Sequence, residues 1–369
     1  MKRFVLFLLI ILLISNTVQG ADMAELAYSA PGTSNGDWSA IALMLSDCDF
    51  DKTRYINALK QYVTGKYELN DKLSRTKSTE WHRIAIAVNL AGEDATDFNG
   101  INLINDGIFY RENLGRQGLN GYVWALIAVC SGDFEEPYEA FNTKNSIINE
   151  ILFRQNSDGG FSVSGNNSSC DMTAMTLYAL SFFQNREEVS VAINKALDYL
   201  SDIQNDDGSF SESGIPNAES TAQVIIALSA LGKDIKSDDC FSRAFDGLML
   251  FKTDDGFSHI AAGETNTIAT YQGMCAVIAA EKPRAIYSKT NTHEHIDSSV
   301  ESPNVVDEVS VSETETETIN TTQADDLTTE DTTNVIQTAP SDNNGSLLII
   351  VFSFIAVCGI ITLYTWRKK

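Results

Sequence analysis

Two carboxylates are the residues of this chain whose type and spacing best suit chemistry. Asp171 and Glu219 each stand two residues before a threonine, Thr173 and Thr221. Because the two settings match, we expect both carboxylates at the N-terminal ends of equivalent helices, on one side of the molecule. Two carboxylates that face one ligand could act as an acid–base pair on a glycan. Capping is the structural alternative, because free amides and the helix dipole stabilise a carboxylate at a helix N-terminus.

The side of the molecule on which these helices begin is called the rim. Other repeats contribute further candidate residues to it, which are polar or aromatic and lie near the expected helix starts. These residues are His259, Glu264, Asn266, Trp38 and Trp81. Together with the two carboxylates they would contact a ligand with polar and apolar parts that enters a central cavity. No catalytic role is assigned to any of them. No group with metal-ligand spacing is found, so neither a metal nor a resident cofactor is expected.

A repeated turn motif sets the organisation of the chain. Three segments resemble one another, namely Gln155–Phe161, Gln204–Phe210 and Lys252–Phe257. Their phenylalanines recur after 49 and then 47 residues. A period of this length is typical of helical repeat proteins. These turns are expected to be structural first, because glycine allows a tight turn and the aromatic ring packs on the neighbouring hairpin.

Two kinds of helix alternate within each repeat. The segment from Thr221 to Leu231 is small and apolar on most sides, which predicts a buried helix. One apolar face of another helix is instead marked by Ile193, Ala196, Leu197 and Leu200, and its opposite face is polar. We therefore expect an inner ring of buried helices wrapped by an outer ring of amphipathic ones.

Six inner helices can be placed along the chain. They are expected to start near Trp38, Trp81, Tyr122, Thr173, Thr221 and Thr270. Six hairpins that close on themselves predict an all-α fold, an (α/α)6 toroid that spans residues 21–285. An open solenoid is the alternative, but it would need polar capping faces at its ends. The apolar final helix, around residues 274–280, favours closure.

Both ends of the chain carry targeting signals. A basic start and an apolar run predict a signal peptide at residues 1–20, with an uncleaved anchor as the alternative. Residues 346–366 are predicted to form a transmembrane helix, and residues 367–369 a basic tail. Positive charge marks the cytoplasmic side, so the expected location is the cell membrane, with a single span and an extracellular toroid.

The segment between the toroid and the membrane differs in composition from the rest. Residues 286–345 hold thirteen acidic residues, twelve threonines and one lysine. Such a segment buries too little apolar area to fold, so it is predicted to be a disordered, extended stalk. It carries about half of the net charge of −24, and this acidity argues against nucleic acid as a partner. The lipid bilayer is the expected partner of the helix that follows.

The repeated turns resemble those of a known superfamily. Gln155-x-x-x-Gly159-x-Phe161 and its equivalent from Gln204 are similar to the Gln-x-x-x-Gly-x-Trp motif of the prenyltransferase and squalene-cyclase repeat superfamily, with Phe for Trp. The resemblance covers residues 30–282. It is closest to a branch of small secreted bacterial proteins, which is similar to the helical domain of the cobalamin carriers. It implies a terpenoid cyclase-like α/α toroid and makes a corrinoid a candidate ligand.

The catalytic chemistry of that superfamily does not carry over to this chain. The cyclases take a proton from Asp-x-Asp-Asp-Thr-Ala, and the aligned residues from Ser169 to Ala174 keep only Asp171. The protein prenyltransferases hold zinc with Asp, Cys and His. Asp239, Cys240 and His259 have these types but not that family's spacing. Terpene cyclase and protein prenyltransferase activities are therefore not expected.

Three functions remain open at this level. The first is a non-catalytic extracellular receptor that captures a small molecule, such as a corrinoid, or a glycan. The second is an extracellular glycan-active hydrolase or lyase that uses Asp171 and Glu219. The third is a structural or adhesive surface protein, which a barrel without a cavity would favour. We favour the first, because intact structural turns accompany a degraded catalytic motif.

Overall fold

The structure is a computed structural model, and it describes residues 18–46 and 48–289. The regular secondary structure of the described residues is helical apart from one short hairpin and a few isolated bridges, which confirms the predicted all-α fold. The predicted transmembrane helix and basic tail lie outside the described residues, as do most of the predicted signal peptide and stalk. Among the described residues, no helix combines the length and the apolar character needed to cross a bilayer.

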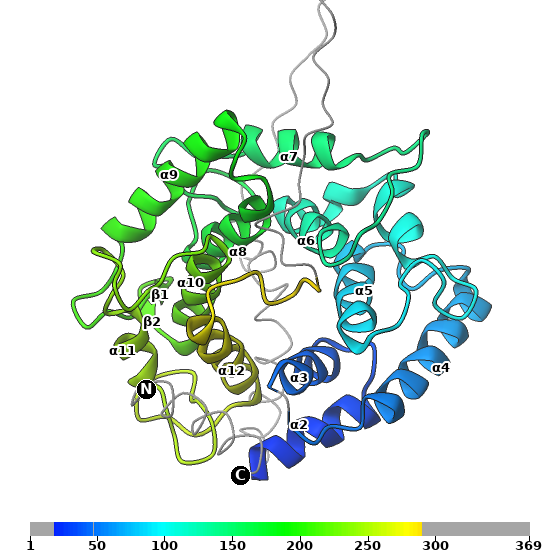
Figure 1. The fold of residues 1–369 in the computed structure, drawn as a ribbon, viewed down its shortest axis with the longest axis horizontal. Coiled ribbons are helices and arrows are strands. Elements are labelled where there is room, and N and C mark those ends of the chain that lie inside the picture. Colours follow the sequence, from blue (N-terminus) through cyan, green and yellow to red (C-terminus); the bar gives the residue numbers. More distant parts are fainter. Residues whose placement is uncertain (1–17, 47, 290–369) are drawn as a thin grey trace, which may run out of the picture. The chain divides into compact units, whose positions relative to one another are not determined.

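Six helices of the described residues contact one another in a ring (Figure 1). They are α3 (Ser34–Leu45), α5 (Ser78–Ala91), α6 (Leu119–Val129), α8 (Cys170–Leu180), α10 (Ala218–Ala230) and α12 (Thr267–Glu281). Each contacts the next in this order, and α12 contacts α3. Every one begins within four residues of the position at which the sequence predicted an inner helix.

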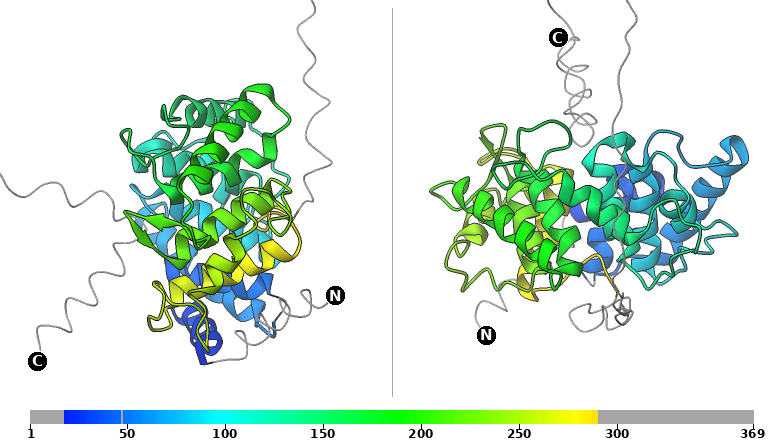
Figure 2. Two further views of the ribbon diagram at one scale, coloured as in Figure 1. Left: turned by 90° about the vertical axis from the view of Figure 1, so that its left-hand side faces the viewer. Right: turned by 90° about the horizontal axis from the view of Figure 1, so that it is seen from above.

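A second layer packs on the outside of this ring (Figure 1). Its elements are α2 (Val18–Ser29), α4 (Lys52–Asn70), the π-helix η1 (Asn105–Phe109), α7 (Lys144–Phe153), α9 (Glu187–Asp202) and α11 (Ala244–Met249). Each precedes one inner helix in the chain, so inner and outer elements alternate. Two side views show the two layers edge-on (Figure 2).

Short elements fill the connections between the helices. Two 3-10 turns are η2 (Leu114–Gln117) and η3 (Ser181–Phe183). The hairpin joins β1 (Ser211–Glu212) to β2 (Ile215–Pro216) in antiparallel register, with Glu212 opposite Ile215. This hairpin directly precedes α10, and one of its residues belongs to the candidate site described below.

Burial distinguishes the inner helices from the outer ones. Nearly every residue of α10 is buried, because small side chains such as Ala222 and Ala227 let neighbours pack on all sides. In α9 burial is confined to one stripe. That stripe consists of Val189, Ala192, Ile193, Ala196 and Leu200. The amphipathic pattern predicted for this segment is therefore confirmed.

Each repeated turn is fastened to the inner helix that follows it. The backbone N–H of the turn phenylalanine donates to a threonine hydroxyl in the first turn of the helix. These bonds join Phe161 to Thr173 at 2.9 Å, Phe210 to Thr221 at 3.0 Å, and Phe257 to Thr270 at 3.0 Å. The three phenylalanine rings are fully buried. The turns thus fix the starts of three inner helices.

Gly159 shows why the turn motif needs glycine. Its φ of +88° lies in the left-handed region, and a Cβ atom would stand 2.4 Å from the carbonyl oxygen of Lys195 in α9. The side-chain amide of Gln155 donates to the carbonyls of Gly159 and Ala192, each at 2.8 Å. The motif therefore joins the turn closely to the backbone of an outer helix.

The chain does not leave the ring where α12 ends. Residues 282–289, which we call the strap, turn back and cross the middle of the ring (Figure 1). Ile286, Tyr287 and Ser288 are buried there. The folded part thus extends four residues beyond the predicted boundary at residue 285, because these side chains find partners inside the ring.

Candidate functional site

Asp171 lies in the first turn of α8, beside a carboxylate from the next repeat. Ser169 caps this helix by accepting from the N–H of Met172 at 3.2 Å. The same hydroxyl donates to Oε2 of Glu212 at 3.0 Å. Asp171 is partly buried, and its Oδ1 is buried without a hydrogen-bond partner among the described residues. Ser169 thus holds Glu212 of the next repeat at the start of α8, close enough to Asp171 to affect its charge.

The Asp171 carboxyl has an unusual affinity for protons. Burial and, after it, the Glu212 carboxylate raise its pKa to about 7, with a smaller rise from Glu219. The nearby Ser220 hydroxyl and His259 act in the opposite direction. At neutral pH this carboxyl can therefore hold or release a proton, as a general acid or a proton-sensitive ligand contact requires.

Glu219 occupies the matching place at the start of α10 and pairs with His259. The imidazole Nδ1 lies 2.8 Å from Oε2 of Glu219, and the N–H of Ala218 donates to the backbone carbonyl of His259 at 3.0 Å. The hydrogen bond to Glu219 raises the pKa of His259, while burial opposes the rise. The side chain of His259 is 53% exposed and that of Glu219 is 15% exposed. The pair is therefore open to solvent on the imidazole side.

Glu264 and Asn266 lie in the same loop as His259 but differ in their surroundings. Asn266 is the N-cap of α12, and its Oδ1 accepts from the N–H groups of Ile268 at 2.8 Å and Ala269 at 3.1 Å. Its amide oxygen is therefore engaged in helix capping. Glu264 is exposed. The structure places both at the start of α12, as the sequence suggested, without contacts that join them to Asp171 or Glu219.

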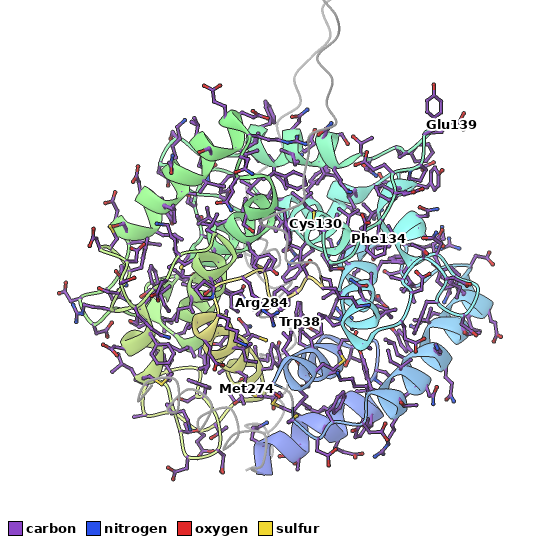
Figure 3. All side chains as sticks on the ribbon, viewed as in Figure 1. Trp38, Cys130, Phe134, Glu139, Met274 and Arg284 are labelled. Carbon is purple, nitrogen blue, oxygen red and sulfur yellow. The ribbon has the colours of Figure 1, made fainter. Side chains whose placement is uncertain are left out.

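The two predicted rim tryptophans pack in other places. Trp38 is buried in the middle of the ring, with its ring centroid 5.1 Å from that of Trp124 (Figure 3). Trp81 is buried towards the outer layer, where its Nε1 donates to the Tyr67 hydroxyl at 3.0 Å. The Arg111 guanidinium lies 4.3 Å from its ring centroid. Both tryptophans thus serve core packing, and neither side chain meets the two carboxylates.

Sequence reasoning missed Glu212, although the repeat contains a signal for it. Glu212 stands two residues after Phe210, and His259 stands two residues after Phe257. In the structure each of these two side chains contacts the start of the inner helix that precedes its turn. An alignment of the turns, extended by two residues, would therefore have predicted that Glu212 lies near Asp171 and His259 near Glu219.

We call Asp171, Glu212, Glu219 and His259 the acidic cluster. Three carboxylates and one imidazole present mainly hydrogen-bond acceptors, so they suit a ligand that brings donors. Among the described residues, no group of three His, Cys, Asp or Glu side chains is arranged to hold a metal ion. The carboxylates and the imidazole of the cluster can take part in hydrogen bonding and proton transfer.

No protein-family model matches the chain, and no curated protein matches it at a significant level. The geometry of the acidic cluster and the sequence are therefore the features that bear on function.

Proposed function

We propose that the chain is a membrane-anchored extracellular protein whose α/α toroid holds a small-molecule or glycan ligand at the acidic cluster without converting it. The ring of inner-helix contacts and the alternation of inner and outer elements support the toroid of six hairpins. The extracellular side and the single membrane span rest on the sequence signals at the two ends. Membership of the prenyltransferase and cyclase superfamily rests on the repeated turns.

The observation that carries this proposal is the buried Oδ1 atom of Asp171. Buried polar atoms almost always have a hydrogen-bond partner, and leaving one unpaired costs about 1–3 kcal/mol. Oδ1 has no hydrogen-bond partner of good geometry among the described residues, and the carboxylates beside it do not donate to it. The Ser220 hydroxyl lies near enough to lower the pKa of Asp171, but it too makes no well-formed hydrogen bond. A ligand that supplies a hydroxyl or amide donor would remove this cost when it binds.

The cluster favours ligands that are rich in donors. Glycans present many hydroxyl groups, and corrinoids carry amide side chains, so both expected ligand classes suit it. The middle of the ring offers a different environment, because Trp38 and Tyr287 pack against each other there. Binding at the rim is therefore the better hypothesis than entry into a central cavity.

Binding to the full chain in detergent tests the proposal. A glycan array and a series of corrinoids, followed by thermal shift and visible absorbance, should yield at least one ligand. Asp171→Asn should lower the affinity for that ligand by about tenfold or more, which corresponds to about 1.4 kcal/mol of binding free energy. Glu264→Gln is the matched control, because it changes an exposed acid of the neighbouring loop outside the cluster. If neither ligand class binds, the structural or adhesive function is favoured instead.

A glycan-active hydrolase or lyase is the second candidate, and the protonation of Asp171 favours it. A carboxyl with a pKa of about 7 is suited to donate a proton to a glycosidic oxygen, while Glu219 would be the second carboxylate. Incubation of the full chain with the oligosaccharides that it binds, followed by product analysis, separates the two candidates. Cleavage that Asp171→Asn abolishes would support the enzyme, and binding without products supports the receptor.

A further inference from the structure

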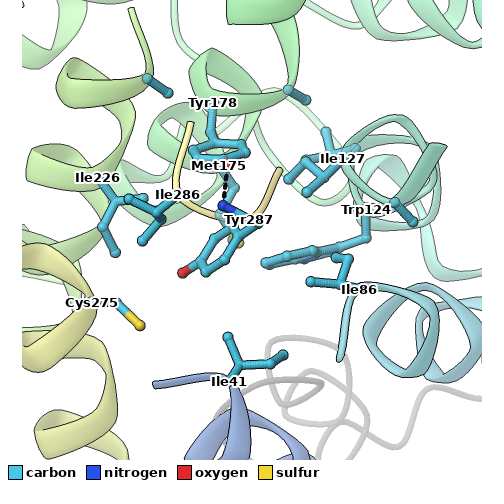
Figure 4. Close-up of a cluster of buried hydrophobic side chains, with 14 of the residues drawn as sticks. Ile41, Ile86, Trp124, Ile127, Met175, Tyr178, Ile226, Cys275, Ile286 and Tyr287 are labelled. Carbon is cyan, nitrogen blue, oxygen red and sulfur yellow. Dashed lines mark hydrogen bonds between the residues drawn. The ribbon is translucent and has the colours of Figure 1, made fainter. Parts of the chain in front are cut away.

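The strap carries an aromatic side chain into the middle of the ring (Figure 4). The Tyr287 ring packs against three aromatic rings that belong to three different inner helices. The centroid distances are 5.5 Å to Trp38, 6.4 Å to Trp124 and 5.1 Å to Tyr178. We call these three residues, with Met175, Ile226 and Cys275 around them, the aromatic socket.

Hydrogen bonds to α8 and to the C-terminal end of α6 hold the strap in place. The backbone N–H of Tyr287 donates to the Tyr178 hydroxyl at 2.8 Å. The Ser288 hydroxyl donates to the carbonyl of Cys130 at 3.0 Å, and the N–H of Lys289 donates to the carbonyl of Ser131 at 3.1 Å. Cys130 caps the C-terminus of α6, where helix carbonyls lack partners within the helix. The strap is thus bound through main-chain and side-chain groups together, as a recognised peptide is.

The ring does not need the strap for its closure. α12 contacts α3 directly, and the strap adds no helix or strand to either layer. Its buried side chains form one short run, from Ile286 to Ser288. The strap therefore packs into the ring of helices as a short peptide packs into its receptor.

We propose that the aromatic socket is a peptide-binding site whose resident occupant is the chain's own strap. The site takes an extended segment with an aliphatic, an aromatic and a hydroxyl residue in succession, as Ile286, Tyr287 and Ser288 show. The aromatic ring packs against the three rings of the socket, and the hydrogen bonds at Tyr178 and Cys130 fix the direction of the segment. Withdrawal of the strap opens the socket to a partner segment of the same chemistry.

This site is separate from the acidic cluster. Asp171 and Tyr178 lie seven residues apart on α8, which corresponds to about 10 Å along the helix. The cluster stands at the N-terminal end of α8, and the strap contacts the C-terminal part of that helix. Occupation of the socket does not depend on the ligand proposed for the cluster, so the two proposals fail independently.

A labelled peptide with the sequence of residues 282–289 tests the proposal on the full chain in detergent. In the wild type the strap has an effective concentration of roughly millimolar or more, so a peptide at about 10 µM cannot displace it. The variant Tyr287→Gly leaves every residue of the socket in place and removes only the occupant's ring. We expect it to bind the peptide at least about tenfold more tightly than the wild type does, by fluorescence anisotropy. A peptide with glycine at the tyrosine position should not bind.

Two controls separate an open socket from a damaged fold. Tyr287→Phe keeps the ring and should exclude the peptide as the wild type does. Far-UV circular dichroism shows whether Tyr287→Gly stays helical; if it does not, Ser288→Gly weakens the strap through the lost hydrogen bond to Cys130 and takes its place. A helical variant that does not bind the peptide at about 1 mM contradicts the proposal.

Discussion

The imidazole of His259 and the carboxylate of Glu219 form an ion pair, at 2.8 Å between Nδ1 and Oε2, that joins two successive repeats. Glu219 belongs to the start of α10, whereas His259 follows the turn that precedes α12. A backbone hydrogen bond from Ala218 to His259 fixes the same junction at 3.0 Å. The repeats are therefore connected at the rim by a contact whose charge depends on pH.

Loss of the His259 side chain should affect stability in a pH-dependent way. The pKa of His259 is raised in the folded state, so its stabilising effect is complete below the unfolded value of about 6.5 and is lost as pH rises through the folded pKa. The pair is partly exposed, so its contribution is about 0.2–1 kcal/mol. We expect His259→Ala to lower the melting temperature at pH 6 and to change it little at pH 9. Equal losses at both pH values would show that the pair contributes through packing instead.

The charged form of Asp171 should instead destabilise the folded state. Its folded-state pKa of about 7 exceeds the unfolded value of about 3.9, so the folded state loses stability as pH rises from about 4 to 7. Asp171→Asn cannot ionise and should escape this loss. We expect the variant to be about 1–4 kcal/mol more stable than the wild type at pH 8.

Urea unfolding at two pH values checks this prediction. Near pH 4 the two proteins should have similar free energies of unfolding, because the wild-type carboxyl is then protonated as well. Wild-type stability that exceeds the variant's at pH 8 would mean that the carboxylate has a stabilising partner.

The inner helices could be predicted because their apolar segments are long and periodic. All six starts agree, and the stripe on α9 follows from Ile193, Ala196 and Leu200. The outer layer was harder to predict, since the outer element that precedes α6 is the five-residue π-helix η1. Its sequence carries no helix-length periodicity. Such an element is stabilised by contacts from elsewhere in the chain.

The candidate site was predicted less completely, for two physical reasons. Trp81 was assigned to the rim from its place near a helix start, but the phase of α5 turns it towards Tyr67 in the outer layer. Tyr287 was assigned to the stalk, because the residues after it are polar and acidic. Its burial depends on Trp38, Trp124 and Tyr178, which are distant in sequence. Local pattern cannot reveal such a contact.

A buried ion pair between Asp37 and Arg83 should be a major determinant of stability in the first half of the ring. Asp37 is fully buried, and its carboxylate lies 2.8 Å from Nε of Arg83. It also accepts from the Tyr55 hydroxyl at 2.9 Å and the N–H of Gly32 at 2.8 Å. Asp37→Ala leaves a buried guanidinium unpaired, so we expect a loss of about 3–5 kcal/mol in urea unfolding.

The exposed pair of Lys60 and Glu93 is the matched control for that experiment. Its atoms lie 2.7 Å apart, but the side chains of Lys60 and Glu93 are 32% and 42% exposed. Glu93→Ala should therefore cost about 1 kcal/mol or less. If Asp37→Ala costs no more than Glu93→Ala, the buried network has no special role.

Two threonines of α8 should respond to the same substitution in opposite ways. Thr173 accepts from the buried N–H of Phe161 at 2.9 Å, and this bond fixes the turn on the helix. Thr173→Val keeps the shape of the side chain but leaves that N–H unpaired, which should cost about 1–3 kcal/mol. Thr176 lies one turn further on, fully buried, and its hydroxyl has no hydrogen-bond partner among the described residues. Thr176→Val replaces a buried, unpaired hydroxyl with a methyl group, so it should be neutral or stabilising. Urea unfolding of the two variants measures both effects within one helix. A similar loss in both would show that the exchange of hydroxyl for methyl, rather than loss of the turn hydrogen bond, determines the cost.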